Sequence, residues 1–176
     1  PETPLYKKSQ VLYGVDLARK EISRRQQAVI VEGYTDVMAA HLSGIETAVA
    51  TCGTAFGVDH IKVLRRLLMD QDEFRGQVIF TFDGDAAGRK AALRAFNEDQ
   101  RFVSQTFVAI EKTGLDPCEL RLQQGPEAVR ELVARRTPLF EFVIRATLDD
   151  YDLNTAEGRV AGLRAVAPVL ATIRDR

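Results

Sequence analysis

Short apolar runs alternate with amphipathic segments through residues 28–110, and this alternation narrows the possible folds more than any other feature. Four runs, "AVIVE" (28–32), "TAVAT" (47–51), "VIFTF" (78–82) and "QTFVAI" (105–110), are typical of buried strands. Strands that alternate with helices form βαβ units, whose crossovers join parallel strands. We therefore predict an α/β fold, with a mainly parallel four-stranded sheet flanked by helices on both faces.

Helical spacing surrounds these strands. Apolar residues recur every three to four positions in residues 11–25, which predicts an amphipathic helix. A second helix is expected after the strand at 28–32, with Thr35 as its N-terminal cap and Gly44 as its C-terminal stop. Its predicted buried face consists of Val37, Met38 and Leu42. Two more helices are expected at about residues 59–68 and 86–97.

Beyond the fourth strand the pattern favours helices alone. Residues 117–136 fit one or two short helices broken at a Gly-Pro pair, and residues 138–148 fit another. Asn154, with Glu157 three residues later, resembles a capping box at the start of a last helix. A small all-helical subdomain is therefore expected to follow the sheet.

The predicted organisation has three parts. These are a helical lead-in from a preceding subdomain at residues 1–25, an α/β domain at 26–112 and the helical subdomain at 113–176. The chain opens on "PETPLYKK" without a methionine, and its helical pattern runs to the last residue. We expect a piece of a longer polypeptide, truncated within the helical subdomain.

Composition excludes several classes of protein. With 45% apolar and 28% charged residues, and no apolar run of roughly 20 residues, the sequence predicts a cytoplasmic protein without membrane association. The two cysteines and two histidines lack the spacing of a zinc site. The net charge of -1 does not point to nucleic-acid binding, so a polyanion would have to meet local basic patches or bound metal.

Acidic residues gather where the predicted strands end. These residues are Glu32, Asp36, Asp83, Asp85 and Asp116. The carboxyl ends of parallel strands meet at one edge of a sheet, so the five side chains are candidates to converge. Carboxylates that converge repel one another unless a cation compensates them. Oxygen ligands without His or Cys favour Mg²⁺ or Mn²⁺, with two or more ions possible.

Within "DGD" the glycine permits a sharp turn, so that Asp83 and Asp85 can present oxygens to one or two ions. Arg89 follows one helical turn later, close enough to project toward a metal-held phosphate. Each acid also has a simpler interpretation, because Asp85 could cap a helix, Asp83 could close a turn and Asp36 could complement a helix dipole. Taken alone, "DGD" would also suit a receiver domain or a haloacid-dehalogenase phosphatase.

Longer stretches of the sequence carry a family resemblance. The segments "VEGYTDVMAAHLSGIETAVATCGTAF", "FDGDAAGRKAALRA" and "LDPCEL" resemble the Toprim core of DnaG-type bacterial primases, and similar flanks extend the resemblance over almost the whole chain. The resemblance implies the catalytic core fragment of a DNA-directed RNA polymerase, which synthesises short RNA primers for DNA replication by metal-dependent nucleotidyl transfer.

The same resemblance implies roles for individual residues. Glu32 is the expected catalytic acid and metal ligand, and Asp83 and Asp85 are expected catalytic residues that bind divalent ions. Asp36 and Asp116 correspond to outer or additional metal ligands, and Lys8 and Arg89 to residues that face nucleotide or nucleic acid. One departure stands out, because the family commonly shows DPD where this chain has Cys118 after Asp116-Pro117. A thiol is a poor Mg²⁺ ligand, which puts an outer metal site in doubt.

The implied partners are a single-stranded DNA template, ribonucleoside triphosphates and the RNA primer, at a replication fork in the nucleoid. Family members also carry a zinc-binding domain, a basic half of the polymerase core and a helicase-binding domain. We expect all three to be absent here, with the replicative helicase bound through an absent domain and the fragment alone weak or inactive. Two alternatives stay open, namely a Toprim nuclease or topoisomerase fragment, and a non-catalytic module that binds nucleotide or nucleic acid.

Overall fold

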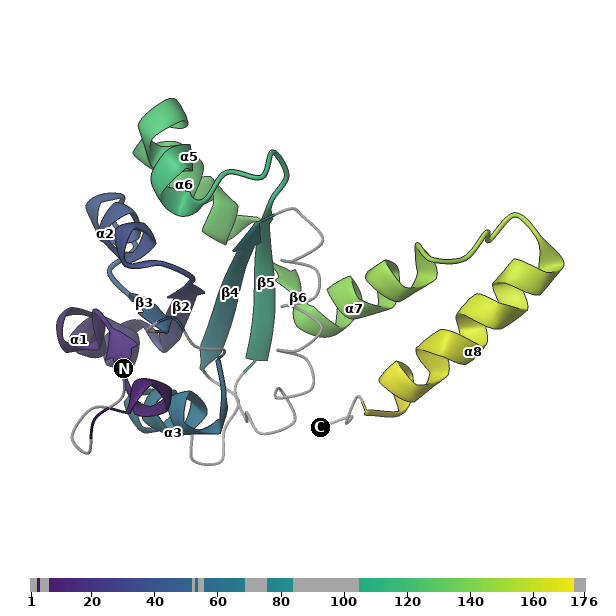
Figure 1. Cartoon of the computed structure of the whole chain (residues 1–176), viewed down its shortest axis with the longest axis horizontal. Helices are drawn as coiled ribbons and strands as arrows, with labels where there is room; N and C mark the ends of the chain where they lie inside the picture. The colour runs from purple at the N-terminus through teal and green to yellow at the C-terminus, as the bar shows by residue number, and fades with distance from the viewer. Residues whose placement is uncertain are drawn as a thin grey trace.

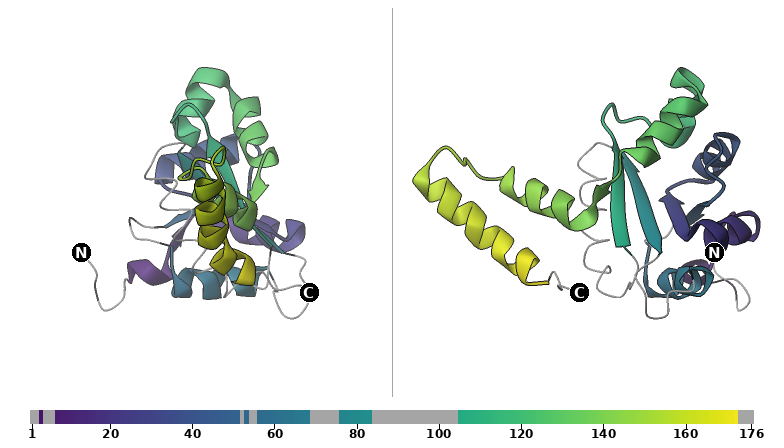
Figure 2. Two further views of the ribbon diagram at one scale, coloured as in Figure 1. Left: turned by 90° about the vertical axis from the view of Figure 1, so that its right-hand side faces the viewer. Right: turned by 180° about the vertical axis from the view of Figure 1, so that it is seen from behind.

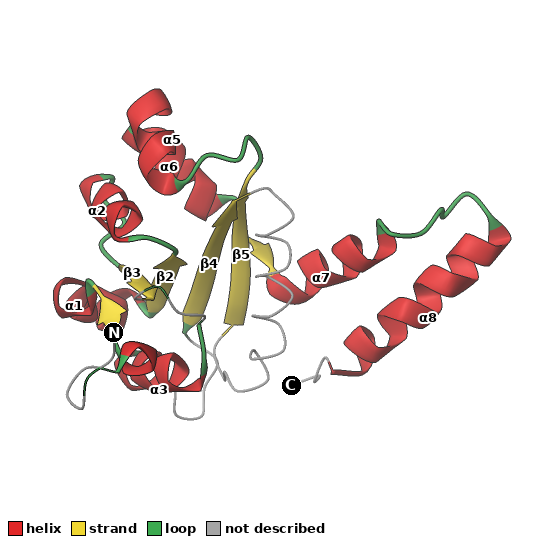
Figure 3. Cartoon of the chain, viewed as in Figure 1, coloured by secondary structure: helices red, strands yellow, loops and turns green. Residues whose placement is uncertain are grey.

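The computed structural model describes residues 3, 7–51, 53, 56–68, 76–83 and 105–172. The strands of its sheet are β1 Leu12–Tyr13, β2 Gln27–Val31, β3 Ala48–Thr51, β4 Gln77–Asp83, β5 Gln105–Glu111 and β6 Thr137–Pro138. The helices are η1 Lys8–Gln10, α1 Val15–Arg25, α2 Tyr34–Leu42, α3 Val58–Leu67, α5 Pro117–Gln124, α6 Pro126–Ala134, α7 Leu139–Leu148 and α8 Ala156–Thr172. Figure 3 shows the helices in red and the strands in yellow. The helix expected at 86–97 lies outside the described residues.

The strand order of the sheet is β1-β3-β2-β4-β5-β6 (Figure 1). The four inner strands are parallel, which confirms the predicted α/β fold and its mainly parallel four-stranded core. Two antiparallel edge strands, β1 and β6, were not expected. The prediction of a helix from residue 11 was wrong at its start, because Leu12 is buried in β1 and the helix begins at Val15.

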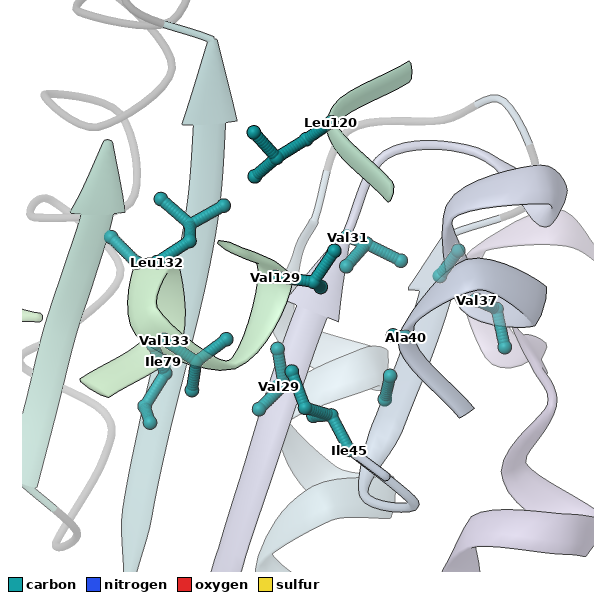
Figure 4. Packing of buried hydrophobic residues seen from close by; sticks show 13 residues of the cluster. Val29, Val31, Val37, Ala40, Ile45, Ile79, Leu120, Val129, Leu132 and Val133 are labelled. Atoms are coloured by element: carbon teal, nitrogen blue, oxygen red, sulfur yellow. The ribbon is translucent and has the colours of Figure 1, made fainter. Parts of the chain in front are cut away.

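Helices cover both faces of the sheet, as predicted. On one face α2, α5 and α6 pack against alternate strand residues that include Val29, Val31 and Ile79 (Figure 4). On the other face α1 and α3 pack against the intervening residues, among them Ile30 and Val78. This division follows from the two-residue period of a strand, which sends successive side chains to opposite faces. The α5–α6 pair thus shares the hydrophobic core of the sheet.

The last two helices are arranged differently from the others. In Figures 1 and 2, α7 and α8 lie side by side and project away from the sheet. Leu139 and Val143 of α7 contact Val108 of β5 and so attach the helix pair to the sheet. Gly162 of α8 allows a close approach, because a Cβ there would lie 3.2 Å from a methyl carbon of Leu148. Among the described helices, none is long and apolar enough to cross a membrane.

Three details of the helices differ from the sequence predictions. Gly33, and not Thr35, is the N-cap of α2, and this helix buries Val37, Ala39 and Ala40. Met38 and Leu42 are instead 52% and 69% exposed. The small side chains of the alanines face the sheet and allow α2 to pack closely against it. In α8 the cap is Thr155 rather than Asn154, since the Thr155 hydroxyl accepts a hydrogen bond from the N–H of Gly158 at 3.0 Å.

Candidate metal-dependent active site

A cleft of about 300 Å³ opens at the carboxyl ends of β2, β4 and β5. Its described lining includes four acidic residues, namely Glu32, Asp36, Glu111 and Asp116. Glu32 follows β2 and Glu111 ends β5, whereas Asp36 and Asp116 lie at the starts of the helices that come next, α2 and α5. Because the strands are parallel, residues up to 84 positions apart in the sequence meet at one edge of the sheet. Three of the five predicted acids therefore line the same cleft.

Glu32 directly follows the buried strand β2, and its side chain is exposed toward the cleft. The central strand β2 fixes its backbone, and the side chain is open to solvent at the cleft. This combination suits a metal ligand, because the sheet sets the position of the carboxylate and an ion can reach it.

Asp36 is placed differently, since it is only 4% exposed. Its Oδ2 accepts a hydrogen bond from the N–H of Gly33 at 2.8 Å, and its Oδ1 accepts one from the N–H of Cys118 at 3.4 Å. Both donors belong to the first turns of helices, which lack intrahelical partners. The simpler interpretation of Asp36, as a complement to a helix N-terminus, therefore describes its contacts well.

Asp116 caps the next helix of the cleft, α5. Its Oδ1 accepts a hydrogen bond from the N–H of Glu119 at 2.7 Å, and Pro117 occupies the first helical position, where no N–H is needed. The neighbouring Cys118 is a poor candidate for a metal ligand. Burial raises the pKa of its thiol, and the carboxylates of Asp116, Asp36 and Glu119 raise it further, so the thiol stays protonated near neutral pH.

Among the remaining predicted residues, Lys8 is the one whose side chain is described. Asp83 ends β4 and pairs in register with Glu111 of β5, so its backbone is at the cleft edge, but its side chain is not among those described. Asp85 and Arg89 lie outside the described residues. Lys8 belongs to η1 and is not among the described lining residues of the cleft, and its carbonyl oxygen lies 3.1 Å from Nε2 of His60.

Glu111 is a cleft residue that the sequence analysis missed. Its Oε2 accepts hydrogen bonds from the N–H and the hydroxyl of Thr113, at 2.6 and 2.8 Å, and from the N–H of Leu115 at 3.0 Å. Partial burial by itself would raise the pKa of Glu111, but these hydrogen bonds outweigh it and hold the pKa below its ordinary value of 4.5. The carboxylate thus fixes the loop between β5 and Asp116.

This contact predicts a pH dependence. The folded-state pKa of Glu111 is lowered, so its stabilising contribution is complete above the ordinary value of 4.5 and is lost as the pH falls through the folded-state pKa. Glu111→Gln should lower the free energy of unfolding by about 1 kcal/mol at pH 7, because charge-assisted hydrogen bonds become neutral ones at a partly exposed site. Urea unfolding at pH 7 and pH 3.5 measures both effects.

The difference between the native chain and Glu111→Gln should shrink at pH 3.5. Glu131→Gln is a suitable control, because Glu131 is exposed and its ion pair with Arg135 joins residues only four positions apart. A native-like stability of Glu111→Gln at pH 7 would contradict the role assigned to this carboxylate.

The side-chain donors that line the described part of the cleft suit a hard divalent ion, because they are carboxylate and hydroxyl oxygens. Among the described side chains, no group of three His, Cys, Asp or Glu residues is arranged to hold a metal. Asp36 and Asp116 accept backbone hydrogen bonds, and Glu32 lies exposed in the cleft at the end of β2. A complete site would need further ligands from the end of β4 and the residues after it, where Asp83 and Asp85 are found.

Family models match two parts of the chain. The model of the Toprim domain matches residues 26–113, and the model of the DnaB-helicase binding domain of primase matches residues 140–176. The first match confirms the predicted resemblance. The second falls on α7 and α8, and it corrects the expectation that nothing in this chain corresponds to a helicase-binding domain.

Curated relatives support the same family. The chain is 62% identical to the DNA primase of Mycolicibacterium smegmatis over 175 residues, which cover 99% of this chain and 28% of that protein. It is also 62% identical to the DNA primase of Streptomyces coelicolor, covering 99% of this chain and 27% of that protein. The chain thus spans little more than a quarter of the length of these relatives.

Solved structures agree in fold. The RNA polymerase domain of Mycobacterium tuberculosis primase DnaG matches with a TM-score of 0.88 and 57% identity, over 99% of this chain and 55% of that one. The catalytic core of the E. coli primase matches with a TM-score of 0.78 and 32% identity, over 98% of this chain and 54% of that one. The chain belongs to the Toprim family, in the branch formed by the RNA polymerase domains of DnaG-type DNA primases.

Proposed function

We propose that this chain is the metal-binding part of a primase polymerase domain that makes RNA primers for DNA replication. One observation carries the proposal: a chain that matches primase polymerase domains over 99% of its length gathers carboxylates in a cleft at the carboxyl ends of its parallel strands. These matches favour a primase over the nuclease and topoisomerase alternatives.

The reaction joins ribonucleoside triphosphates on a DNA template. The 3′-hydroxyl of one nucleotide attacks the α-phosphate of the next, and pyrophosphate leaves. Glu32, Asp83 and Asp85 would hold Mg²⁺ or Mn²⁺, which when bound supplies positive charge that stabilises the attacking and leaving oxygens. Glu111 and Asp116 keep the loop after β5 in place beside that site.

The template and nucleotides are assigned by similarity. A related primase catalytic domain has been solved bound to single-stranded DNA, and the M. tuberculosis domain in complex with a double-stranded oligomer that has a 6-nucleotide overhang. We assign single-stranded DNA as the template here, with Lys8 and Arg89 as phosphate-contacting residues. The expected place of action is the replication fork in the cytoplasm.

This chain covers 55% of the matched M. tuberculosis domain, so we expect the rest of a polymerase domain to contribute to template binding. The chain alone should bind Mn²⁺ but make little primer. The experiment is template-directed RNA synthesis by a polymerase domain that contains this chain, with the native sequence and with Asp83→Asn. Equal synthesis by both would overturn the proposal.

A second function is favoured by the match of the helicase-binding model to residues 140–176. One stripe of α8 exposes apolar side chains, with Val160, Leu163 and Leu170 at 48%, 66% and 50% exposure. Their spacing places them within one face of the helix, which is typical of a helix that binds a partner through that face. This face is the proposed contact for a DnaB-type replicative helicase.

Leu163→Asp should weaken binding of a primase that contains this chain to its helicase by roughly 10–100-fold, since a central apolar contact is lost and a charge is desolvated. Leu122→Asp is the matched control, because Leu122 of α5 is 76% exposed and lies outside the matched region. Surface plasmon resonance measures both affinities. Native affinity of the Leu163 variant would exclude this face.

A further inference from the structure

The carboxylate of Asp36 connects the segment after β2, which carries Glu32, with the segment after β5, which carries Asp116. Its Oδ2 accepts the N–H of Gly33, the residue after Glu32, at 2.8 Å. Its Oδ1 accepts the N–H of Cys118, two residues after Asp116, at 3.4 Å. The two donors lie 85 positions apart in the sequence, one after β2 and the other after β5.

The N-termini of both helices favour a negative charge at this point. The first N–H groups of α2 and α5 have no acceptors within their own helices. The positive end of each helix dipole lies at the same N-terminus, next to the carboxylate of Asp36. In α5 the first position is Pro117, which has no N–H, and the next two N–H groups go to Asp36 and Asp116. The charge of Asp36, which is 4% exposed, is thereby compensated by the backbone.

A side chain at position 33 would press on the carboxylate of Asp36. A Cβ at position 33 would lie 3.0 Å from Oδ2 of Asp36, closer than nine in ten real Cβ contacts. The φ angle of Gly33 is −111°, which any residue adopts, so steric contact with the carboxylate is the reason for glycine here. Gly33→Ala therefore pushes the Asp36 carboxylate by a few tenths of an ångström and removes no acid from the cleft.

From these contacts we infer that Asp36 is a positioning residue, which sets the separation of Glu32 and Asp116 across the cleft and does not itself bind the metal. This inference rests on the proposed function of the cleft as a metal site. It replaces the role of outer metal ligand that the family resemblance implies for Asp36, because both carboxylate oxygens already accept backbone hydrogen bonds.

The test combines amide exchange with Mn²⁺ binding on the 176-residue chain. Asp36→Asn keeps the shape of the side chain but presents an NH₂ group to one of the two N–H donors. Hydrogen exchange of the Gly33 and Cys118 amides, followed by NMR without metal, should accelerate about 10-fold or more at one or both positions. The variant should bind the same number of Mn²⁺ ions as the native chain, but with roughly 10–100-fold lower affinity, which is the usual effect of mutating a residue that orients metal ligands.

Gly33→Ala should lower Mn²⁺ affinity in the same direction, whereas Asp59→Asn, which removes an acid from the first turn of α3 away from the cleft lining, should not. Loss of one bound ion in Asp36→Asn, or unchanged protection of both amides, would overturn the inference. A native chain that binds no Mn²⁺ would instead refute the metal site, and the amide exchange would still decide whether Asp36 connects the two segments.

Discussion

Replacement of Asp83 by Asn is expected to reduce primer synthesis by roughly 10²–10³-fold or more in a polymerase domain that contains this chain, since charge stabilisation of the transferring phosphoryl group is lost. Asp83 ends β4 in register with Glu111, so its backbone lies at the cleft edge beside the strand that leads to Glu32. Primer synthesis with labelled ribonucleotides, titrated with Mg²⁺ and Mn²⁺, measures the loss.

A matched control separates this effect from a simple change of charge. Asp16→Asn removes one exposed acid from the first turn of α1 and should leave synthesis unchanged. If Asp83→Asn also synthesised primers normally, the cleft would not be the catalytic centre. The chain would then fit the alternative of a non-catalytic module that binds nucleotide or nucleic acid.

Ile79→Ala is expected to cause the largest loss of stability. Ile79 lies in β4 between β2 and β5, is completely buried, and contacts the α2, α5 and α6 side of the core. Truncation of a buried isoleucine removes apolar burial and leaves a cavity, which together cost about 2–5 kcal/mol of the free energy of unfolding. Because the total stability of a domain is only about 5–15 kcal/mol, much of the chain should unfold at moderate urea concentrations.

Two further substitutions calibrate this prediction. Ile79→Val should cost only about 0.5–1.5 kcal/mol, because one methylene is removed. Leu17→Ala should cost less than about 0.5 kcal/mol, since Leu17 is 70% exposed. Urea unfolding of the three variants provides the free energies. A loss below 1 kcal/mol in Ile79→Ala would mean that the core is not packed around β4 as described.

The parallel core was predictable because its strands are long enough to show a pattern. Runs such as residues 78–82 are continuously apolar, as expected for strands covered on both faces. The edge strands β1 and β6 contain two residues each, and pairing with β3 and β5 defines them rather than any periodicity. No spacing rule applies to two residues, so Leu12 was assigned to the following helix.

In the candidate site, too, the sequence pattern revealed only features that are local in the chain. Glu32 and Asp116 were found because they follow apolar runs, and the structure places both at one cleft. Glu111 was missed although it also follows an apolar run, because with Lys112 beside it the residue resembles one of a solvated charge pair. Its role depends on the loop that folds back onto it. The contact of Asp36 with Cys118 joins residues 82 positions apart, and no local pattern indicates it.

The central claim is that a divalent ion binds at the carboxyl ends of β2 and β4. A crystal of this chain soaked in millimolar Mn²⁺, with data collected at a wavelength where manganese scatters anomalously, tests it most directly. We predict an anomalous peak within coordination distance, about 2.0–2.5 Å, of carboxylate oxygens of Glu32 and of Asp83 or Asp85, and none on Asp36. The absence of any peak at this edge of the sheet would contradict the assignment of the cleft as a metal-dependent active site.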